Sequence, residues 1–178
     1  MQATFLEDRL GVEVELDIPD GWRATGRLVP QLGYPAELAG IANQELGPTG
    51  PGAMHDALPD VAKLGPTSAL VWVTVGDYAF DREAAELTGP NRGVPAAELR
   101  RRRPQEVAHV PPMASGDLPS SSSQWPGYHQ WARVIPVSAS HYVTVYAWAQ
   151  ENEEIMRTEQ PPAQVGAIVG SMKVRDYS

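Results

Sequence analysis

Cysteine is absent from the sequence, which excludes a disulfide, a thiolate nucleophile and a cysteine-ligated metal. No apolar run approaches the roughly twenty residues that a transmembrane helix needs. The start, Met1–Asp8, has neither the basic nor the apolar region of a signal peptide. We therefore expect a cytoplasmic protein without a transmembrane segment, or an exported one if a leader has been removed.

Basic residues are few, with 14 Lys and Arg against 22 Asp and Glu, which gives a net charge of −8. This acidic balance argues against nucleic acid or an anionic membrane as the main partner. Phenylalanine is also scarce, at 2 residues beside 5 Trp and 6 Tyr. Because Trp and Tyr rings carry a polar group, they are common at interfaces as well as in cores.

Proline and glycine are abundant instead, at 17 and 16 of 178 residues, which favours many turns over a simple helical bundle. A hydrophobic content of 42% is enough for one core, so we expect a single domain over residues 1–178. Within it, the Pro- and Ser-rich segment 106–127 is predicted to be a long flexible loop.

Two segments have the pattern of central strands. In His141–Ala149, small side chains alternate with aromatic ones and neither face of the strand is charged. The apolar run in Ala69–Ala79 is typical of the same position. The strand predicted at Trp131–Ser138 is joined to His141–Ala149 by so short a turn that the two must form an antiparallel hairpin.

The N-terminal segment Gly11–Pro19 alternates between apolar and acidic residues, as a half-buried strand does. The turn Pro19-Asp20-Gly21 follows it, since proline fixes φ and glycine accepts a positive φ. We expect the next strand, Trp22–Pro30, to pair back on the first in a second hairpin.

Helices are predicted at Pro35–Leu46 and Pro162–Met172, because each has an apolar stripe and a proline at its start. Two shorter helices are expected at Asp81–Leu87 and Val94–Arg103, and a closing strand at Lys173–Arg175. Together the elements predict an α+β fold, a twisted antiparallel sheet flanked by helices.

Chemistry-bearing motifs are sparse. The four histidines form no HExxH motif, and no Walker loop, Gly-x-Ser-x-Gly or Gly-x-Gly-x-x-Gly motif occurs. His129 and His141 could meet across the hairpin and, with an acid, hold a metal, but a histidine at a strand start is more often only hydrogen-bonded. We therefore predict no catalytic residue, no metal site and no cofactor.

Two clusters are candidate binding residues. The first is an aromatic group in seven residues, Trp125, Tyr128, His129 and Trp131, which suits a recognition surface or the rim of a pocket. The second is the run Arg100, Arg101, Arg102 and Arg103, which suits an anionic docking patch. The structural alternatives are rings that cap the end of the sheet and a solvated helix end.

Two motifs resemble the PsbP-like superfamily, which includes the Mog-type Ran-binding proteins. They are the turn Pro19-Asp20-Gly21-Trp22 and the strand Tyr142–Val145 followed by a helix ending in Ile168–Met172. Leu87-Thr88-Gly89 is similar to the actinobacterial LpqN-type proteins, although this chain lacks their leader and lipobox cysteine. The resemblance implies a PsbP-like fold in a protein that binds without catalysis.

The function expected from this resemblance is a non-catalytic binding or accessory domain acting through contacts with an unidentified protein partner. The alternative is a small enzyme or ligand-binding protein that takes a small molecule into an aromatic-lined pocket, as a secondary-metabolism cyclase does. A cyclase that works by shape would leave no motif, so the residues alone keep both readings open.

Overall fold

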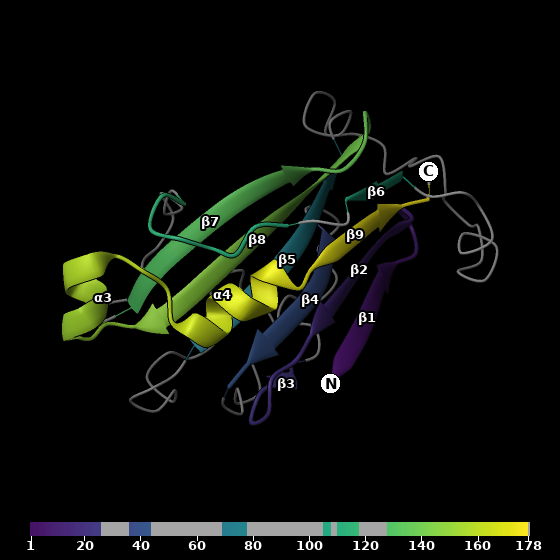
Figure 1. Ribbon diagram of the computed structural model, residues 1–178. Helices are drawn as coiled ribbons and strands as arrows, with labels where there is room; N and C mark the ends of the chain where they lie inside the picture. Colours follow the sequence, from purple (N-terminus) through teal and green to yellow (C-terminus); the bar gives the residue numbers. More distant parts are fainter. Residues whose placement is uncertain (26–35, 44–68, 78–104, 108–109, 118–127, 178) are drawn as a thin grey trace, which may run out of the picture.

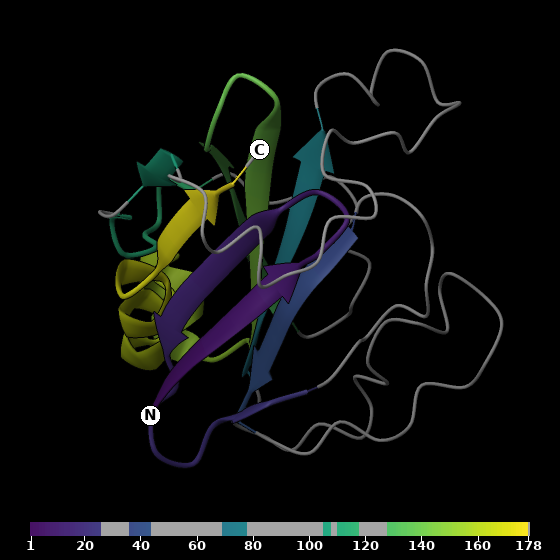
Figure 2. The same ribbon diagram turned by 90° about the vertical axis from the view of Figure 1, so that its right-hand side faces the viewer.

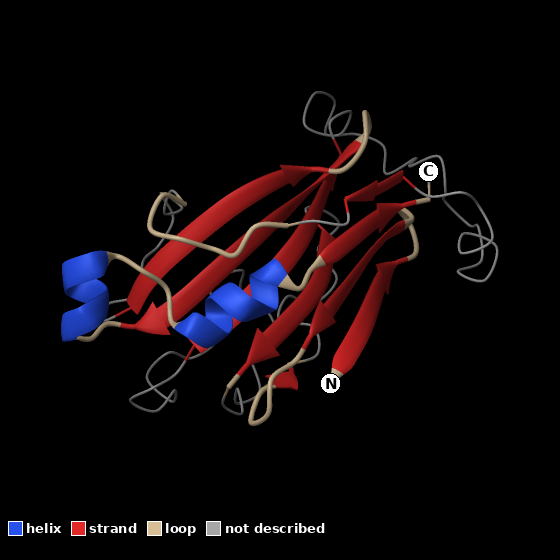
Figure 3. Ribbon diagram, in the orientation of Figure 1, coloured by secondary structure: helices blue, strands red, loops and turns tan. Residues whose placement is uncertain are grey.

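The computed structural model describes residues 1–25, 36–43, 69–77, 105–107, 110–117 and 128–177. They form two antiparallel sheets and two short helices, so the described part is α+β and mostly strand (Figures 1 and 3). The five-stranded sheet has the order β3 (Arg23–Ala24), β4 (Ala36–Ala42), β5 (Ala69–Asp77), β8 (His141–Gln150), β7 (Tyr128–Pro136). The four-stranded sheet has the order β1 (Gln2–Glu7), β2 (Val12–Asp17), β9 (Lys173–Asp176), β6 (Gln105–Val107).

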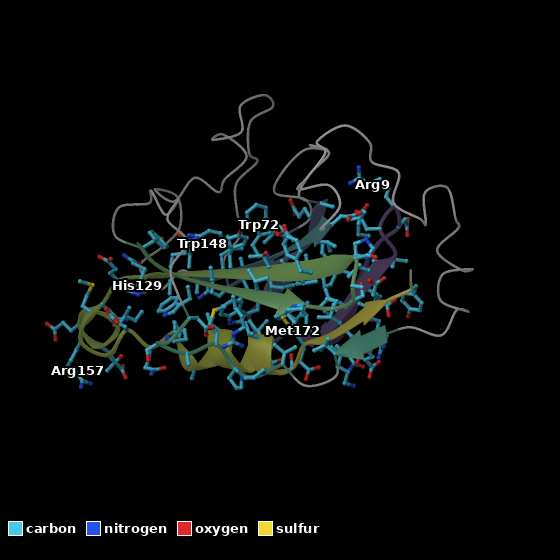
Figure 4. The ribbon with its side chains drawn as sticks, turned by 90° about the horizontal axis from the view of Figure 1, so that it is seen from above. Arg9, Trp72, His129, Trp148, Arg157 and Met172 are labelled. Atoms are coloured by element: carbon cyan, nitrogen blue, oxygen red, sulfur yellow. The ribbon has the colours of Figure 1, made fainter. Side chains whose placement is uncertain are left out.

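The main core lies on one face of the five-stranded sheet. The four-stranded sheet and helix α4 (Ala163–Gly170) cover that face, as Figures 1 and 2 show. Val73, Val145 and Ile168 are fully buried there, because apolar side chains from both sheets and the helix meet. Figure 4 shows Met172 on the helix side of the sheet and Trp148 on the opposite side, which we call the outer face.

Strand β8 is central, between β5 and β7. Its pairing with β5 runs without a shift from Asp77 opposite His141 to Ala69 opposite Ala149. The hairpin predicted for Trp131–Ser138 and His141–Ala149 is confirmed by the antiparallel pairing of β7 with β8. The central position predicted for the two apolar strands is confirmed as well.

The helix predicted at Pro35–Leu46 is wrong, because residues 36–42 form strand β4 in the five-stranded sheet. Leu38 and Ile41 suggested a helical stripe, yet neighbouring residues on both faces are buried too. Gly40 lies opposite Trp72 and has no side chain to compete with the large ring. Gly40 also lowers the helix propensity of this segment. Pairing with β5 therefore decides its structure against the local apolar pattern.

The second predicted hairpin is also wrong, because β2 and β3 belong to different sheets. The turn after β2 forms, with the Trp22 amide donating to the Pro19 carbonyl at 3.0 Å and Gly21 at a positive φ of 83°. It directs the chain from one sheet to the other. Strand β2 instead pairs with β9 and with β1, a strand that was not predicted.

Part of the predicted loop 106–127 is ordered by contacts that its composition does not reveal. Its first residues belong to β6, which pairs with β9. Further on, Val110 and Met113 are buried in the main core. The Arg133 guanidinium binds Asp117 at 2.6 Å and also donates to the carbonyls of Pro111 and Pro112. These contacts hold residues 110–117 against β7 and the helix.

Helix α4 confirms the helix predicted at Pro162–Met172, and β9 the closing strand. Gly166 and Gly170 allow a close approach, but to the segment 110–117 and not to the sheet. A Cβ at Gly170 would lie 3.0 Å from Cγ of Pro112, and one at Gly166 would lie 3.6 Å from the Met113 carbonyl oxygen. Helix α3 (Glu153–Thr158) was not predicted; the helices predicted at 81–87 and 94–103 lie outside the described residues.

Candidate functional site

Strand β7 separates the residues of the predicted aromatic group. Tyr128 packs on the outer face of the five-stranded sheet, in a cluster with Trp148. Trp131 points to the main core, where it is 1% exposed and its Nε1 donates to the Glu159 carbonyl at 2.8 Å. The His129 ring lies 4.7 Å from the Trp131 ring, on the same side. Trp125 and the arginines Arg100, Arg101, Arg102 and Arg103 lie outside the described residues.

The outer face carries a different aromatic group, which we call the aromatic ladder: Trp72 of β5 and Tyr146 and Trp148 of β8. The Tyr146 and Trp148 rings are stacked with centroids 5.7 Å apart. The Trp72 ring lies 5.5 Å from that of Tyr146 and 6.1 Å from that of Trp148. Figure 4 shows Trp72 and Trp148 on the same side of the sheet. The alternation along His141–Ala149 already separated these rings from the aliphatic face.

The register explains why three large rings fit together. Trp72 lies between Gly40 and Tyr146 in neighbouring strands, and Ala132 lies on the far side of Tyr146. The row therefore places two rings between two small residues. Trp148 is buried, whereas Trp72 and Tyr146 are only half-buried, so part of the ladder is accessible. Burial raises the pKa of the Tyr146 hydroxyl, which keeps it a neutral donor over a wide pH range.

Three buried polar atoms belong to the ladder or lie beside it. They are Nε1 of Trp72, Oε1 of Gln130 and Oε1 of Gln150, and none has a hydrogen-bond partner in the described part of the chain. Gln130 lies opposite Trp148 and Gln150 lies opposite Tyr128, so both belong to the same outer face. An unsatisfied buried group costs about 1–3 kcal/mol. The outer face thus has one donor and two acceptors buried at or beside the ladder.

A second polar cluster lies on the core side, where β8 begins. Nδ1 of His141 is 2.7 Å from Oδ2 of Asp176, and the hydroxyl of Ser138 donates to the same oxygen at 2.5 Å. The backbone amides of Ser140 and His141 donate to that hydroxyl at 3.1 Å each. Nε2 of His141 is 3.8 Å from Oδ2 of Asp77, which is beyond hydrogen-bond distance.

The buried cluster does not have the arrangement of a nucleophile, base and acid. In a catalytic triad the hydroxyl contacts the imidazole, whereas here Ser138 contacts the carboxylate. His141 is 0% exposed and Asp176 is 1% exposed, so substrate has no direct access. The geometry suits a structural role, in which these hydrogen bonds hold the β7–β8 turn against β9.

The two histidines considered for a metal do not meet. His129 lies opposite Ala149, at the end of β8, and His141 begins that strand. Within the described ranges, no group of three or more His, Asp or Glu side chains is placed to hold a metal ion.

Charged residues on the four-stranded sheet are paired with one another. The Arg175 guanidinium donates to Glu106 at 2.6 Å, to Glu13 at 3.0 Å and to Glu15 at 3.3 Å. These carboxylates, Glu106 first, raise the pKa of Arg175 above its ordinary value. The network joins β2, β9 and β6 across the sheet, so we assign it to stability.

No family model, no curated protein and no solved structure matches this chain. Among the helices of the described residues, none is both long and apolar enough to cross a membrane.

Proposed function

We propose that this chain is a non-catalytic binding or accessory domain that acts through protein–protein contacts, and that the outer face of its five-stranded sheet is the contact surface. One observation carries the proposal: Trp72 and Tyr146 stand half-buried on that face, where three buried polar atoms have no hydrogen-bond partner among the described residues. Trp and Tyr are among the residues that dominate the energetics of protein interfaces, because each offers a large rigid area and a polar group.

The resemblance to the PsbP-like superfamily supports the same class of function. It rests on the turn Pro19-Asp20-Gly21-Trp22 and on the strand and helix at the C-terminal end. A PsbP-like fold is therefore part of the proposal, and the antiparallel α+β architecture is compatible with it. The burial of His141 and Asp176 also argues for binding over catalysis, since the only buried imidazole–carboxylate pair among the described residues is closed to substrate.

The alternative is a small-molecule site, and the polar atoms around the ladder favour it. A ligand that displaces the groups covering these buried atoms could accept from Nε1 of Trp72 and donate to Oε1 of Gln130 and of Gln150. The rings would then contact its apolar part. Such a site would suit either a ligand-binding protein or a small enzyme.

Affinity capture from cells of the source organism tests the protein-binding proposal. The bait is compared with its Trp72→Ser and Tyr146→Ser variants and with Met156→Ser, a control on α3 where Met156 is 60% exposed. We expect one protein to be retained by the parent and by Met156→Ser and lost from the two ladder variants, each checked for folding by thermal unfolding. A protein retained equally by all four baits would refute the proposed surface.

Native mass spectrometry of the purified protein tests the alternative. A bound small molecule that disappears in Gln130→Leu, without any protein lost from the ladder variants, would replace the protein-binding proposal with the ligand-binding one.

A further inference from the structure

Residues 110–117, which we call the strap, pass between β7 and α4 and belong to neither sheet (Figure 1). Among the described residues, no backbone–backbone hydrogen bond joins the strap to another element. Val110 and Met113 are buried in the main core and anchor it there. The strap is therefore held through side-chain contacts, as a bound peptide often is.

Arg133 of β7 makes most of the polar contacts to the strap. Its guanidinium binds the Asp117 carboxylate through two nitrogens, at 2.7 and 2.6 Å. It also donates to the carbonyl of Pro111 and, at 3.0 Å, to that of Pro112. Arginine has five N–H donors, and these four hydrogen bonds all go to the strap. The Ala114 amide holds the same carboxylate in place at 2.7 Å.

The strap site, which we define as Arg133, Gly166 and Gly170, suits a pair of prolines. Proline has no N–H, so the two carbonyls are the only backbone polar groups of Pro111 and Pro112, and Arg133 binds both. The two glycines leave room on α4, where a Cβ at Gly170 would lie 3.0 Å from Cγ of Pro112. Because proline-rich segments are already extended, they lose little entropy on binding.

We propose that the strap site binds a proline-rich peptide of another protein, and that the strap occupies this site in cis as an autoinhibitory contact. The peptide has the pattern of the strap: an apolar residue, two prolines, a second apolar residue and, four positions further on, an acid. The proposal does not rest on the function proposed for the outer face, because α4 and the strap site lie on the core side of the five-stranded sheet.

Displacement of the strap requires a local opening, and its attachment allows one. Segments with few backbone hydrogen bonds open at a lower cost in free energy than the strands of a core. The strap is tethered, so it competes at a high effective concentration. The apparent affinity for a free peptide is reduced to the fraction of molecules in which the site is open. A loosened strap should therefore raise this affinity.

Fluorescence anisotropy with a labelled synthetic peptide of residues 110–117 tests the proposal. In the protein, Asp117→Ala removes the carboxylate of the strap but keeps Arg133 for the carboxylate of the peptide. We expect this variant to bind the peptide about tenfold more tightly than the parent, because the strap loses charged hydrogen bonds. Arg157→Gln, an exposed position on α3, is the control and should match the parent. Equal affinities of Asp117→Ala and the parent would overturn the proposal.

Two further variants locate the peptide and guard against misfolding, with folding checked by thermal unfolding. Adding Arg133→Gln to Asp117→Ala should abolish the gain, and unchanged binding would place the peptide elsewhere and overturn the proposal. Gln160→Ala removes only an exposed hydrogen bond to Ser115 of the strap, at 3.0 Å. It should give a smaller gain in affinity. If Asp117→Ala does not fold, the absence of any gain in Gln160→Ala overturns the proposal instead.

Discussion

Nδ1 of His141 lies 2.7 Å from Oδ2 of Asp176, although 35 positions separate the two residues in the sequence. The same carboxylate oxygen accepts from Ser138, so one side chain holds both the hairpin turn and the start of β8 against β9. Asp176→Ala should therefore cost about 3 kcal/mol in the free energy of unfolding, because a buried imidazole and a half-buried hydroxyl lose their partner.

Urea denaturation measures this cost. Asp20→Ala serves as a control, because Asp20 is exposed in the turn after β2. Unfolding of Asp176→Ala at the same midpoint as Asp20→Ala would show that the buried pair contributes nothing to stability.

Val145 tests the core between the two sheets. It is 0% exposed on the aliphatic face of β8, as the sequence pattern predicted. Val145→Ala should destabilise the protein by about 2 kcal/mol through the lost methyl groups and the cavity. Val145→Asp should unfold it, since it buries an unpaired carboxylate. Val134→Asp, on the exposed side of the adjacent strand, should stay within about 0.5 kcal/mol of the parent. If all three variants unfold together with the parent, β8 is not central.

Gly76 and Tyr142 form a pair in which the ring covers the glycine. They lie opposite each other in β5 and β8, and a Cβ at Gly76 would come within 2.1 Å of the Tyr142 ring. Gly76→Ala should therefore cost about 1–3 kcal/mol, as overpacking does. In a Tyr142→Ala background the same change should cost much less. A double-mutant cycle by chemical denaturation measures the coupling, and additive costs would contradict the close contact.

Gly166 provides the opposite case. The nearest atoms to a Cβ built there are at 3.6 and 3.9 Å, which is ordinary contact. Gly166→Ala should therefore stabilise the protein by up to about 1 kcal/mol, because alanine favours the helix. Gly170→Ala should gain less, since its Cβ would lie 3.0 Å from Pro112. Thermal unfolding compares the two, and a larger gain at Gly170 would contradict the packing of residues 110–117 on α4.

Glu15 should titrate at an unusually low pH. The hydrogen bond from Lys173 at 3.2 Å is the main cause that lowers the pKa of this carboxyl; burial opposes it, and the hydrogen bond from Arg175 lowers the pKa further. Because the folded pKa is lower than the unfolded one, the ion pairs stabilise the fold above the ordinary pKa, and this contribution is lost as the pH falls through the folded pKa. Carboxyl NMR titration should show a rise in the pKa with Lys173→Gln and no change with Arg157→Gln.

The sequence predicts those elements whose partners are close along the chain. The β7–β8 hairpin needs only a short turn, and the two faces of His141–Ala149 already separate the core side chains from the aromatic ladder. Helix α3 also had a local signal, since Asn152 caps it and Glu153 and Glu154 occupy its first turn.

The remaining features depend on distant partners. Residues 36–42 become a strand because β5 pairs with them, and their own periodicity favours a helix. The tie between His141 and Asp176 and the grouping of Gln130, Gln150 and Trp72 arise only when the sheets form. The side chains of the predicted binding group around Trp131 lie on both faces of the sheet, because consecutive strand residues point to opposite faces.

The pairing of β2 with β9 has a consequence for how the protein is made. Tyr177 donates to Glu13 across 164 positions, and the backbone pairs of these two strands span similar separations. Non-local pairing of this kind slows folding, because the entropy cost of closing a long loop comes before the stabilising contacts form. During synthesis β2 is translated long before β9, the strand with which it pairs. A nascent chain that has just completed β8 can close its five-stranded sheet, but leaves one side of β2 open to chaperones.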